Sequence, residues 1–172
     1  METREDHTAR GRSAKAVSTP TARERAVVAL WGDLTHASDV VRSRLAVLLE
    51  AGIGLAPDEV ELLMVLAAAP EQRLRMIDVS ESLRLSKSGV TRLVDRLQKR
   101  GLVLRAACPS DRRVVYAGLT AQGSATLDAV SPVFVAGLME HLGGRFEEAQ
   151  IERLRGDLRR IVARDGKAGA DS

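Results

Sequence analysis

The chain has 172 residues, of which 45% are hydrophobic and 28% charged, as in a globular protein with one core. A single cysteine excludes an intrachain disulfide, the longest apolar run (62–69) is far shorter than a membrane span, and residues 1–17 lack the apolar segment of a signal peptide. We therefore expect a cytoplasmic protein with no membrane partner. Aromatic residues make up only 2%, so the core must be aliphatic, which favours helices.

The N-terminal third predicts a tail and one long helix. Residues 1–22 are polar with charges of both signs and are predicted to form a flexible tail. From residue 22 to about 51, apolar residues recur at helical spacing. A helix this long, with little of its own domain around it, indicates pairing with another chain, and we assign 23–55 as a dimerisation helix. Its apolar face comprises Val27, Leu30, Trp31, Leu34, Ser38, Val41, Leu45 and Leu48.

Two short helices are predicted next. Pro57 stands where a missing N–H costs nothing at a helix N-terminus, and Pro70 would end that helix. A third helix is predicted over 75–83, and only residues 84–86 separate it from the following one. Two helices joined by so short a turn are typical of a helix-turn-helix. The predicted buried side of the first of these two helices is Val60, Leu63, Met64 and Ala67.

The stretch 85–101 predicts an amphipathic helix with a DNA-reading face. Ser86 is its expected N-cap and Gly101 its C-terminal stop, and the apolar stripe is Val90, Leu93, Val94 and Leu97. Short hydroxyls and arginine near a helix N-terminus suit the major groove, because arginine offers a bidentate fork to guanine. Lys87, Arg96 and Lys99 are expected to contact phosphates rather than bases, and the alternative is that these side chains are only solvated. The candidate DNA-binding residues here are Ser86, Lys87, Ser88, Thr91, Arg92 and Arg96.

Positive charge is concentrated around this helix. Nine basic and two acidic residues between Arg84 and Arg113 give that segment a net charge of +7, whereas the rest of the chain carries −4. A basic patch on an acidic body is typical of a surface that faces a polyanion.

After residue 101 the pattern changes from helical to extended. Residues 102–105 and 114–119 are predicted to form two strands joined by turn residues at 108–111. With Arg112 and Arg113 near its tip, this ribbon is a candidate wing whose guanidinium groups enter a minor groove. A structural ion pair of Arg113 with Asp111 or Asp95 is the alternative. Residues 56–119 thus form the predicted winged helix-turn-helix DNA-binding domain.

Two further helices complete the chain. Thr120 is the expected cap of the first, and Pro132 should kink or interrupt it. The second runs from about 147 to 164. The predicted inward residues are Leu127, Val130, Phe134, Leu138 and Leu142 in the first, and Ile151, Leu154, Leu158, Ile161 and Val162 in the second.

This order of elements resembles the multiple antibiotic resistance regulator (MarR) family of winged-helix transcription factors. The resemblance covers about residues 25–164 and rests on Ser86-x-Ser88-Gly89-Val90-Thr91-Arg92-Leu93-Val94-Asp95-Arg96-Leu97, Gly101-Leu102-Val103, Pro109-x-Asp111-x-Arg113 and Leu119-Thr120-x-x-Gly123. It implies a mainly α fold: a winged helix-turn-helix with a two-stranded β-wing, flanked by long N- and C-terminal dimerisation helices. Residues 120–165 would be the C-terminal dimerisation helices and 166–172 a second flexible tail.

The resemblance also implies function. It implies an obligate homodimer whose recognition helices enter successive major grooves of double-stranded DNA at a pseudo-palindrome, with Ser88, Thr91 and Arg92 at the DNA face. Arg113 matches the family's wing-tip arginine, Asp111 would orient an arginine, and Arg112 holds a variable position.

The remaining candidates concern small ligands. Relatives bind small anionic aromatics where the dimerisation helices meet the winged domain, so Trp31 is a candidate effector contact, the alternative being a tryptophan in the interface core. Oxidant-sensing relatives carry their thiol on the first helix, so Cys108 is interpreted as an incidental thiol. The three histidines lack metal-ligand spacing and no catalytic arrangement is present, so neither a metal, a cofactor nor an enzyme is expected.

We therefore predict a sequence-specific DNA-binding transcriptional regulator, a ligand-responsive repressor that binds its operator as a homodimer. Two alternatives stay open. A winged helix can serve as a protein-interaction module, with the basic patch meeting an acidic partner. A non-specific architectural DNA-binding protein would instead show salt-sensitive binding to all DNA alike.

Overall fold

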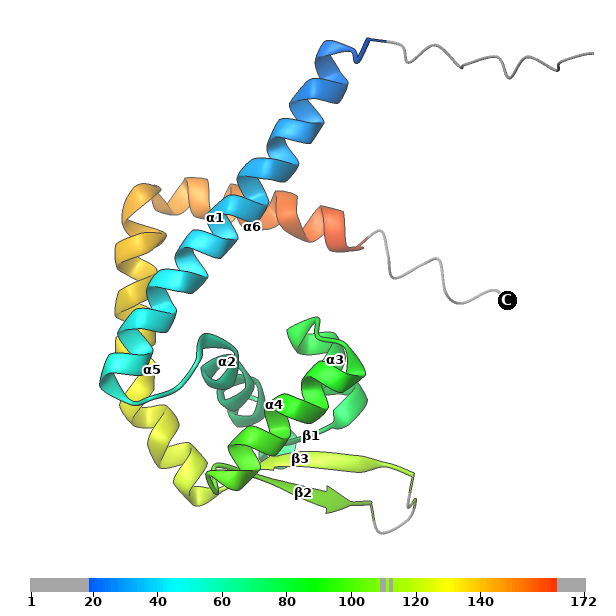
Figure 1. The fold of residues 1–172 in the computed structure, drawn as a ribbon, viewed down its shortest axis with the longest axis vertical. Helices are drawn as coiled ribbons and strands as arrows, with labels where there is room; N and C mark the ends of the chain where they lie inside the picture. The colour runs from blue at the N-terminus through cyan, green and yellow to red at the C-terminus, as the bar shows by residue number, and fades with distance from the viewer. Residues whose placement is uncertain (1–18, 109–110, 112, 164–172) are drawn as a thin grey trace, which may run out of the picture. The chain divides into compact units, whose positions relative to one another are not determined.

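The computed structural model describes residues 19–108, 111 and 113–163, so the predicted tails, apart from 19–22, lie outside the described residues. Residues up to His36 form one unit and those from Ala37 a second, in which the core lies. The elements in chain order are α1 (Ala22–Gly52), α2 (Pro57–Ala67), η1 (Pro70–Gln72), β1 (Arg73–Arg75), α3 (Met76–Leu83), α4 (Lys87–Lys99), β2 (Val103–Ala107), β3 (Val115–Leu119), α5 (Ala121–His141), η2 (Gly143–Arg145) and α6 (Glu148–Ala163) (Figure 1).

The core is aliphatic, as the composition predicted. It is built from leucine and valine of α1, α2, α4 and the sheet, joined by Phe134 of α5. Each such side chain contributes about 1.5–3 kcal/mol when fully buried. In α2 the buried stripe is shifted from the predicted one: Leu62 and Leu66 are fully buried, whereas Met64 is 38% exposed. The prediction for Met64 was wrong because the face of α2 that packs on the core is centred on residues 59–66.

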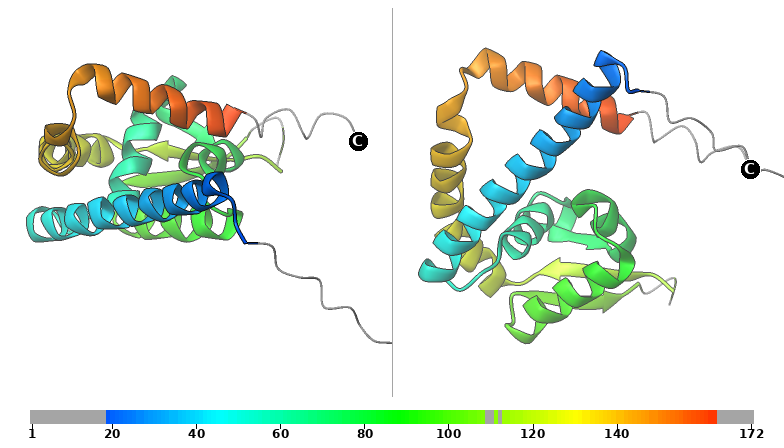
Figure 2. Two further views of the ribbon diagram at one scale, coloured as in Figure 1. Left: turned by 90° about the horizontal axis from the view of Figure 1, so that it is seen from above. Right: turned by 45° about the horizontal axis from the view of Figure 1, so that its top comes forward.

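The wing is the predicted antiparallel hairpin, with Val103 opposite Leu119 and Ala107 opposite Val115. Its two strands lie beside α4, and β3 extends beyond the end of α3 (Figures 1 and 2). The prediction of a two-stranded sheet was incomplete, because β1 pairs with the other edge of β3 and gives the strand order β1-β3-β2. Three residues of sequence Arg-Leu-Arg offer too short an alternation to be recognised as a strand.

The cap predicted for α5 is confirmed, since the Thr120 Oγ1 accepts a hydrogen bond from the Gly123 N–H at 2.9 Å. The helix continues without interruption through Pro132, and its axis bends part-way along (Figures 1 and 2). Its inner side packs against α2 through Val130 and Phe134, whereas Leu142 at its end is exposed.

Apolar side chains on one side of α6 are exposed among the described residues. Leu154 is 40% exposed, and Leu158 and Ile161 are exposed as well, although all three were predicted to face inward. The Val162 side chain lies outside the described residues. In the unit that ends at His36, Val27, Leu30 and Trp31 of α1 are likewise exposed. The predicted helices are therefore present, but within each of these two units the described residues leave these apolar side chains exposed.

Candidate nucleic-acid interface

Local signals hold α4 in place and fix which side faces outward. The Ser86 Oγ accepts a hydrogen bond from the Gly89 N–H at 3.1 Å, and Gly101 follows the helix at a φ of 74°, a value that glycine adopts without strain. The four residues of the predicted apolar stripe, Val90, Leu93, Val94 and Leu97, are all buried. Because this stripe is fixed in the core, the opposite side of α4 must face solvent.

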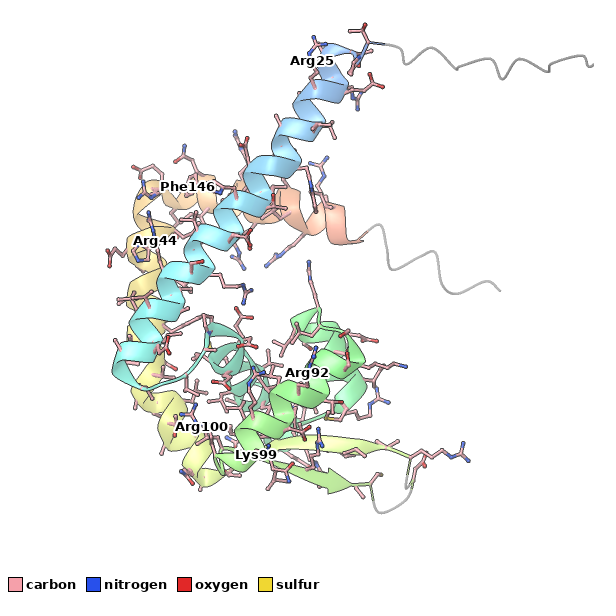
Figure 3. The ribbon with its side chains drawn as sticks, viewed as in Figure 1. Arg25, Arg44, Arg92, Lys99, Arg100 and Phe146 are labelled. Carbon is pink, nitrogen blue, oxygen red and sulfur yellow. The ribbon has the colours of Figure 1, made fainter. Side chains whose placement is uncertain are left out.

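The outward side of α4 carries most of the predicted DNA-reading residues. Lys87, Ser88, Thr91 and Arg92 are all exposed, and Figure 3 labels Arg92 and Lys99 on this helix. The Thr91 Oγ1 donates to the Lys87 carbonyl at 3.0 Å, and the Ser86 and Ser88 hydroxyls lie 3.1 Å apart. Within the described part of the chain, neither Lys87 nor Arg92 forms an ion pair, so both cationic side chains are available to an anionic partner.

At the wing, Asp111 contacts the backbone of the residues that lead into β3. The Asp111 carboxylate accepts a hydrogen bond from the Arg113 N–H at 2.9 Å, and the Asp111 carbonyl accepts one from the Val114 N–H. The Arg113 side chain is exposed and, among the described residues, makes no ion pair. The alternative pairing with Asp95 is not seen, because the Asp95 carboxylate pairs with Arg105 instead. Arg112 lies outside the described residues.

Arg105 of β2 connects the wing to the recognition helix. Its Nη1 lies 2.7 Å from the Asp95 carboxylate, and its Nη2 donates to the Thr91 carbonyl at 3.1 Å. These two contacts join β2 of the wing to α4. Between α3, α4 and the wing lies an open hollow of about 520 Å³, with an apolar floor that includes Val90 and Val115 and a cationic rim that includes Arg113.

Two arginines of α4 and its C-cap have partners that sequence reasoning missed. Arg96, predicted as a phosphate contact, donates to Glu59 at 3.1 Å and to Asp58 at 3.0 Å. The hydrogen bond that Arg96 donates to Glu59 and the negative charge of Asp58 raise the pKa of the Arg96 guanidinium. Arg100 donates to the Gly54 carbonyl at 2.7 Å. The signal available in the sequence, Asp58-Glu59 at the start of α2, also fits a favourable interaction with the helix dipole and so does not identify these partners.

Trp31 lies in the unit that ends at His36, where its side chain is 69% exposed. The Trp31 carbonyl accepts a hydrogen bond from the Thr35 hydroxyl. This contact involves the backbone of Trp31 and not its indole ring. An exposed tryptophan on an apolar helix face suits both the effector-contact and the interface interpretation, and these remain predictions.

Comparisons with known proteins agree with this geometry. The family model described as MarR family matches residues 53–114. The chain is 32% identical over 108 residues to the HTH-type transcriptional regulator MhqR of Bacillus subtilis, covering 63% of this chain and 72% of that protein. It is 31% identical to Sco3205 of Streptomyces coelicolor, a MarR family transcriptional regulator solved in complex with DNA, with a TM-score of 0.76 over 89% of this chain and 97% of that one. The chain belongs to the MarR family.

MarR proteins are transcriptional regulators and not enzymes, so this chain is a transcriptional regulator of the winged-helix type. CouR of Rhodococcus jostii RHA1, solved with p-coumaroyl-CoA bound, is 25% identical, with a TM-score of 0.66 over 74% of this chain and 87% of that one. No helix in residues 19–108 and 113–163 is long and apolar enough to cross a membrane.

Proposed function

We propose that this MarR-family regulator binds a pseudo-palindromic operator as a homodimer and represses transcription until a small aromatic or anionic effector binds. The observation that carries the proposal is the outward side of α4, where Lys87 and Arg92, which form no ion pair with any residue that the structure describes, lie near a capped helix N-terminus. The DNA complex of Sco3205, a structure that covers most of this chain, supports the same role. In the cell such a protein would act in the cytoplasm, where bacterial DNA lies.

The proposed contacts divide by type. Ser88, Thr91 and Arg92 would read base edges in the major groove, and Ser86 and Lys87 would bind phosphates. Arg113, exposed at the wing tip, would enter the minor groove together with Arg112. These assignments are supported by exposure and by the absence of ion pairs on Arg92 and Arg113 within the described residues.

The proposed homodimer rests on apolar side chains of α6 that the described residues leave exposed. Large contiguous apolar patches are rare on monomers and mark interaction surfaces. Leu154, Leu158 and Ile161 recur three or four residues apart along one side of α6, and each is at least 38% exposed. A second copy that packs there would bury these side chains and hold two recognition helices about 34–36 Å apart, the separation of successive major grooves.

An effector would act by changing the separation of the two recognition helices in the dimer. CouR, a structural relative, was solved with p-coumaroyl-CoA, an anionic ligand with an aromatic part. A ligand that binds more tightly to a conformation with the wrong helix separation would lower operator affinity. The exposed indole of Trp31 is a candidate contact for the aromatic part of such a ligand.

The decisive experiment is a gel shift against the gene's own upstream region at two salt concentrations. Specific binding that weakens steeply as salt rises is expected, because phosphate contacts release counterions. Arg92→Ala should cost about 1–3 kcal/mol on the operator and relax specificity at one base pair per half-site. Lys99→Ala is the matched control, since loss of one exposed positive charge should weaken binding to all DNA to a similar extent. Equal affinity for unrelated DNA would favour an architectural protein, and no DNA binding would favour a protein-interaction module.

A further inference from the structure

The C-terminal end of α4 is tied to the junction between α1 and α2 by a cluster of four charged side chains. The cluster comprises Asp58, Glu59, Arg96 and Arg100. At its centre is Glu59, which is only 6% exposed and is the buried charged residue of the described core. One Glu59 oxygen accepts from Arg96, and the other accepts from the Ala56 N–H at 3.0 Å and lies 3.5 Å from Arg100.

Arg100 extends this cluster to the end of α1. Its guanidinium donates to the Gly54 carbonyl at 2.7 Å and reaches the Ile53 carbonyl at 3.5 Å. Residues 53–54 directly follow α1, and Leu49 in its last turns is fully buried in the core. The two arginines therefore link α4 to the loop that leaves α1 and to the first turn of α2.

Burial makes this link hard to break. A carboxylate removed from water is costly unless it is paired and hydrogen-bonded, so Glu59 needs both arginines and the backbone donor. A guanidinium that bridges two carboxylates in fixed geometry has fewer donors left for a phosphate than an unpaired one. Arg96 thus differs from Lys87 and Arg92, which have no such partners among the described residues.

We propose that Glu59 is a positioning residue for operator binding, which holds α4 through Arg96 and Arg100 in a fixed orientation relative to the end of α1. The inference rests on the proposed function, because its main readout is operator affinity. In a dimer that is held together through α1, this link makes the orientation of each recognition helix depend on the orientation of α1. Arg96 then serves DNA binding through orientation and not through a phosphate contact.

Glu59→Gln distinguishes a role in orienting α4 from a simple effect of the negative charge, because the two would change operator affinity in opposite directions. Removal of a negative charge beside a DNA-binding surface strengthens binding if the field alone matters. Loss of the link instead weakens operator binding, by about tenfold if the coupling is typical of a charged hydrogen-bonded network. The matched control is Glu61→Gln on the same helix, where the same charge is lost from a half-exposed residue whose ion pair, with Arg42, spans 3.7 Å. We expect Glu61→Gln to bind the operator as tightly as the wild type or slightly tighter.

Arg96→Lys provides a second test that keeps the charge and is applicable even if Glu59→Gln does not fold. A lysine is a point charge and cannot bridge both carboxylates in the same way, but it serves as well as arginine for a simple phosphate contact. We expect Arg96→Lys to lose operator affinity by about the same factor as Glu59→Gln, with an unchanged dependence of log K on log salt. The double variant should bind no worse than either single one, because both break the same link.

The outcomes are distinguishable. Wild-type protein that does not prefer its own upstream region overturns the proposed function and this role with it. Wild-type protein that binds specifically, while Glu59→Gln binds as tightly as Glu61→Gln, overturns this inference alone. This inference alone is also overturned if Arg96→Lys keeps full operator affinity. It is overturned as well if Arg96→Ala reduces the slope of log K against log salt by about 1 per site, as the loss of a phosphate contact does. Circular dichroism and thermal melts of each variant confirm that folded proteins are compared.

Discussion

The first turn of α5 packs so tightly against the start of the wing that the addition of a single methyl group there should lower the stability of the fold. A Cβ built on Gly123 lies 2.1 Å from the Leu102 carbonyl oxygen and 2.8 Å from the Leu119 side chain. Ordinary carbon–oxygen contacts lie at about 3.3–3.6 Å, so Gly123→Ala requires a shift of about 1 Å. The carbonyl cannot simply turn away, because it accepts hydrogen bonds from the Thr120 N–H at 3.2 Å and from the Thr120 hydroxyl at 3.1 Å.

The expected cost follows from these contacts. Overpacking of a rigid site costs about 1–3 kcal/mol, and loss of the Thr120 cap adds about 0.5–2 kcal/mol. We therefore expect Gly123→Ala to lower the free energy of unfolding by about 2–5 kcal/mol in urea denaturation at a fixed protein concentration. Gly52→Ala is the control, since nothing lies within 4 Å of its Cβ, and it should change stability by less than about 1 kcal/mol. A Gly123→Ala protein as stable as that control would refute the packing argument.

Three further predictions concern the dimer seam, the backbone and pH. Leu154→Asp places a charge on the uncovered apolar side of α6 and should yield monomers or insoluble protein in size-exclusion chromatography; a soluble dimer would refute this assignment of the seam. Gln72 has a φ of 53°, so Gln72→Gly should raise the melting temperature, by a gain of up to about 1 kcal/mol, and a lower melting temperature would contradict this. The hydrogen bond from Arg75 lowers the pKa of Asp78, so this carboxylate stabilises the fold above its unfolded pKa and that contribution disappears as pH falls below about 4. Asp78→Asn should be less stable than the wild type at pH 7 and equally stable in acid, whereas a difference independent of pH would count against the pairing.

The parts of the fold with local signals could be predicted from the sequence. The N-cap at Ser86, the stop at Gly101 and the cap at Thr120 each depend on residues within a few positions, and the structure confirms all three. The strand β1 was missed because its identity depends on pairing with β3, more than 40 residues later, and only Leu74 of its three residues is partly buried. Its arginine at position 73 stacks over the Tyr116 ring of β3, a contact that no local pattern reveals.

The candidate site shows the same division. Exposure of Arg92 follows directly from the helical stripe that buries Leu93, so it could be inferred from spacing alone. The environment of Arg96 could not, because Glu59 lies 37 residues away and is brought close only by the packing of α2 against α4. The net charge of +7 that was counted from the sequence therefore overestimates the positive charge that this segment can present to DNA. Two acids from α2 that this count does not include, Asp58 and Glu59, lie against the segment and pair with Arg96.

Hydroxyl-radical footprinting of the upstream region with the wild-type protein tests the central claim most directly. Two copies that present α4 to successive major grooves predict two protected patches related by a two-fold axis, with centres about 10–10.5 base pairs apart. A single protected patch, or uniform weak protection along the whole fragment, would contradict the account.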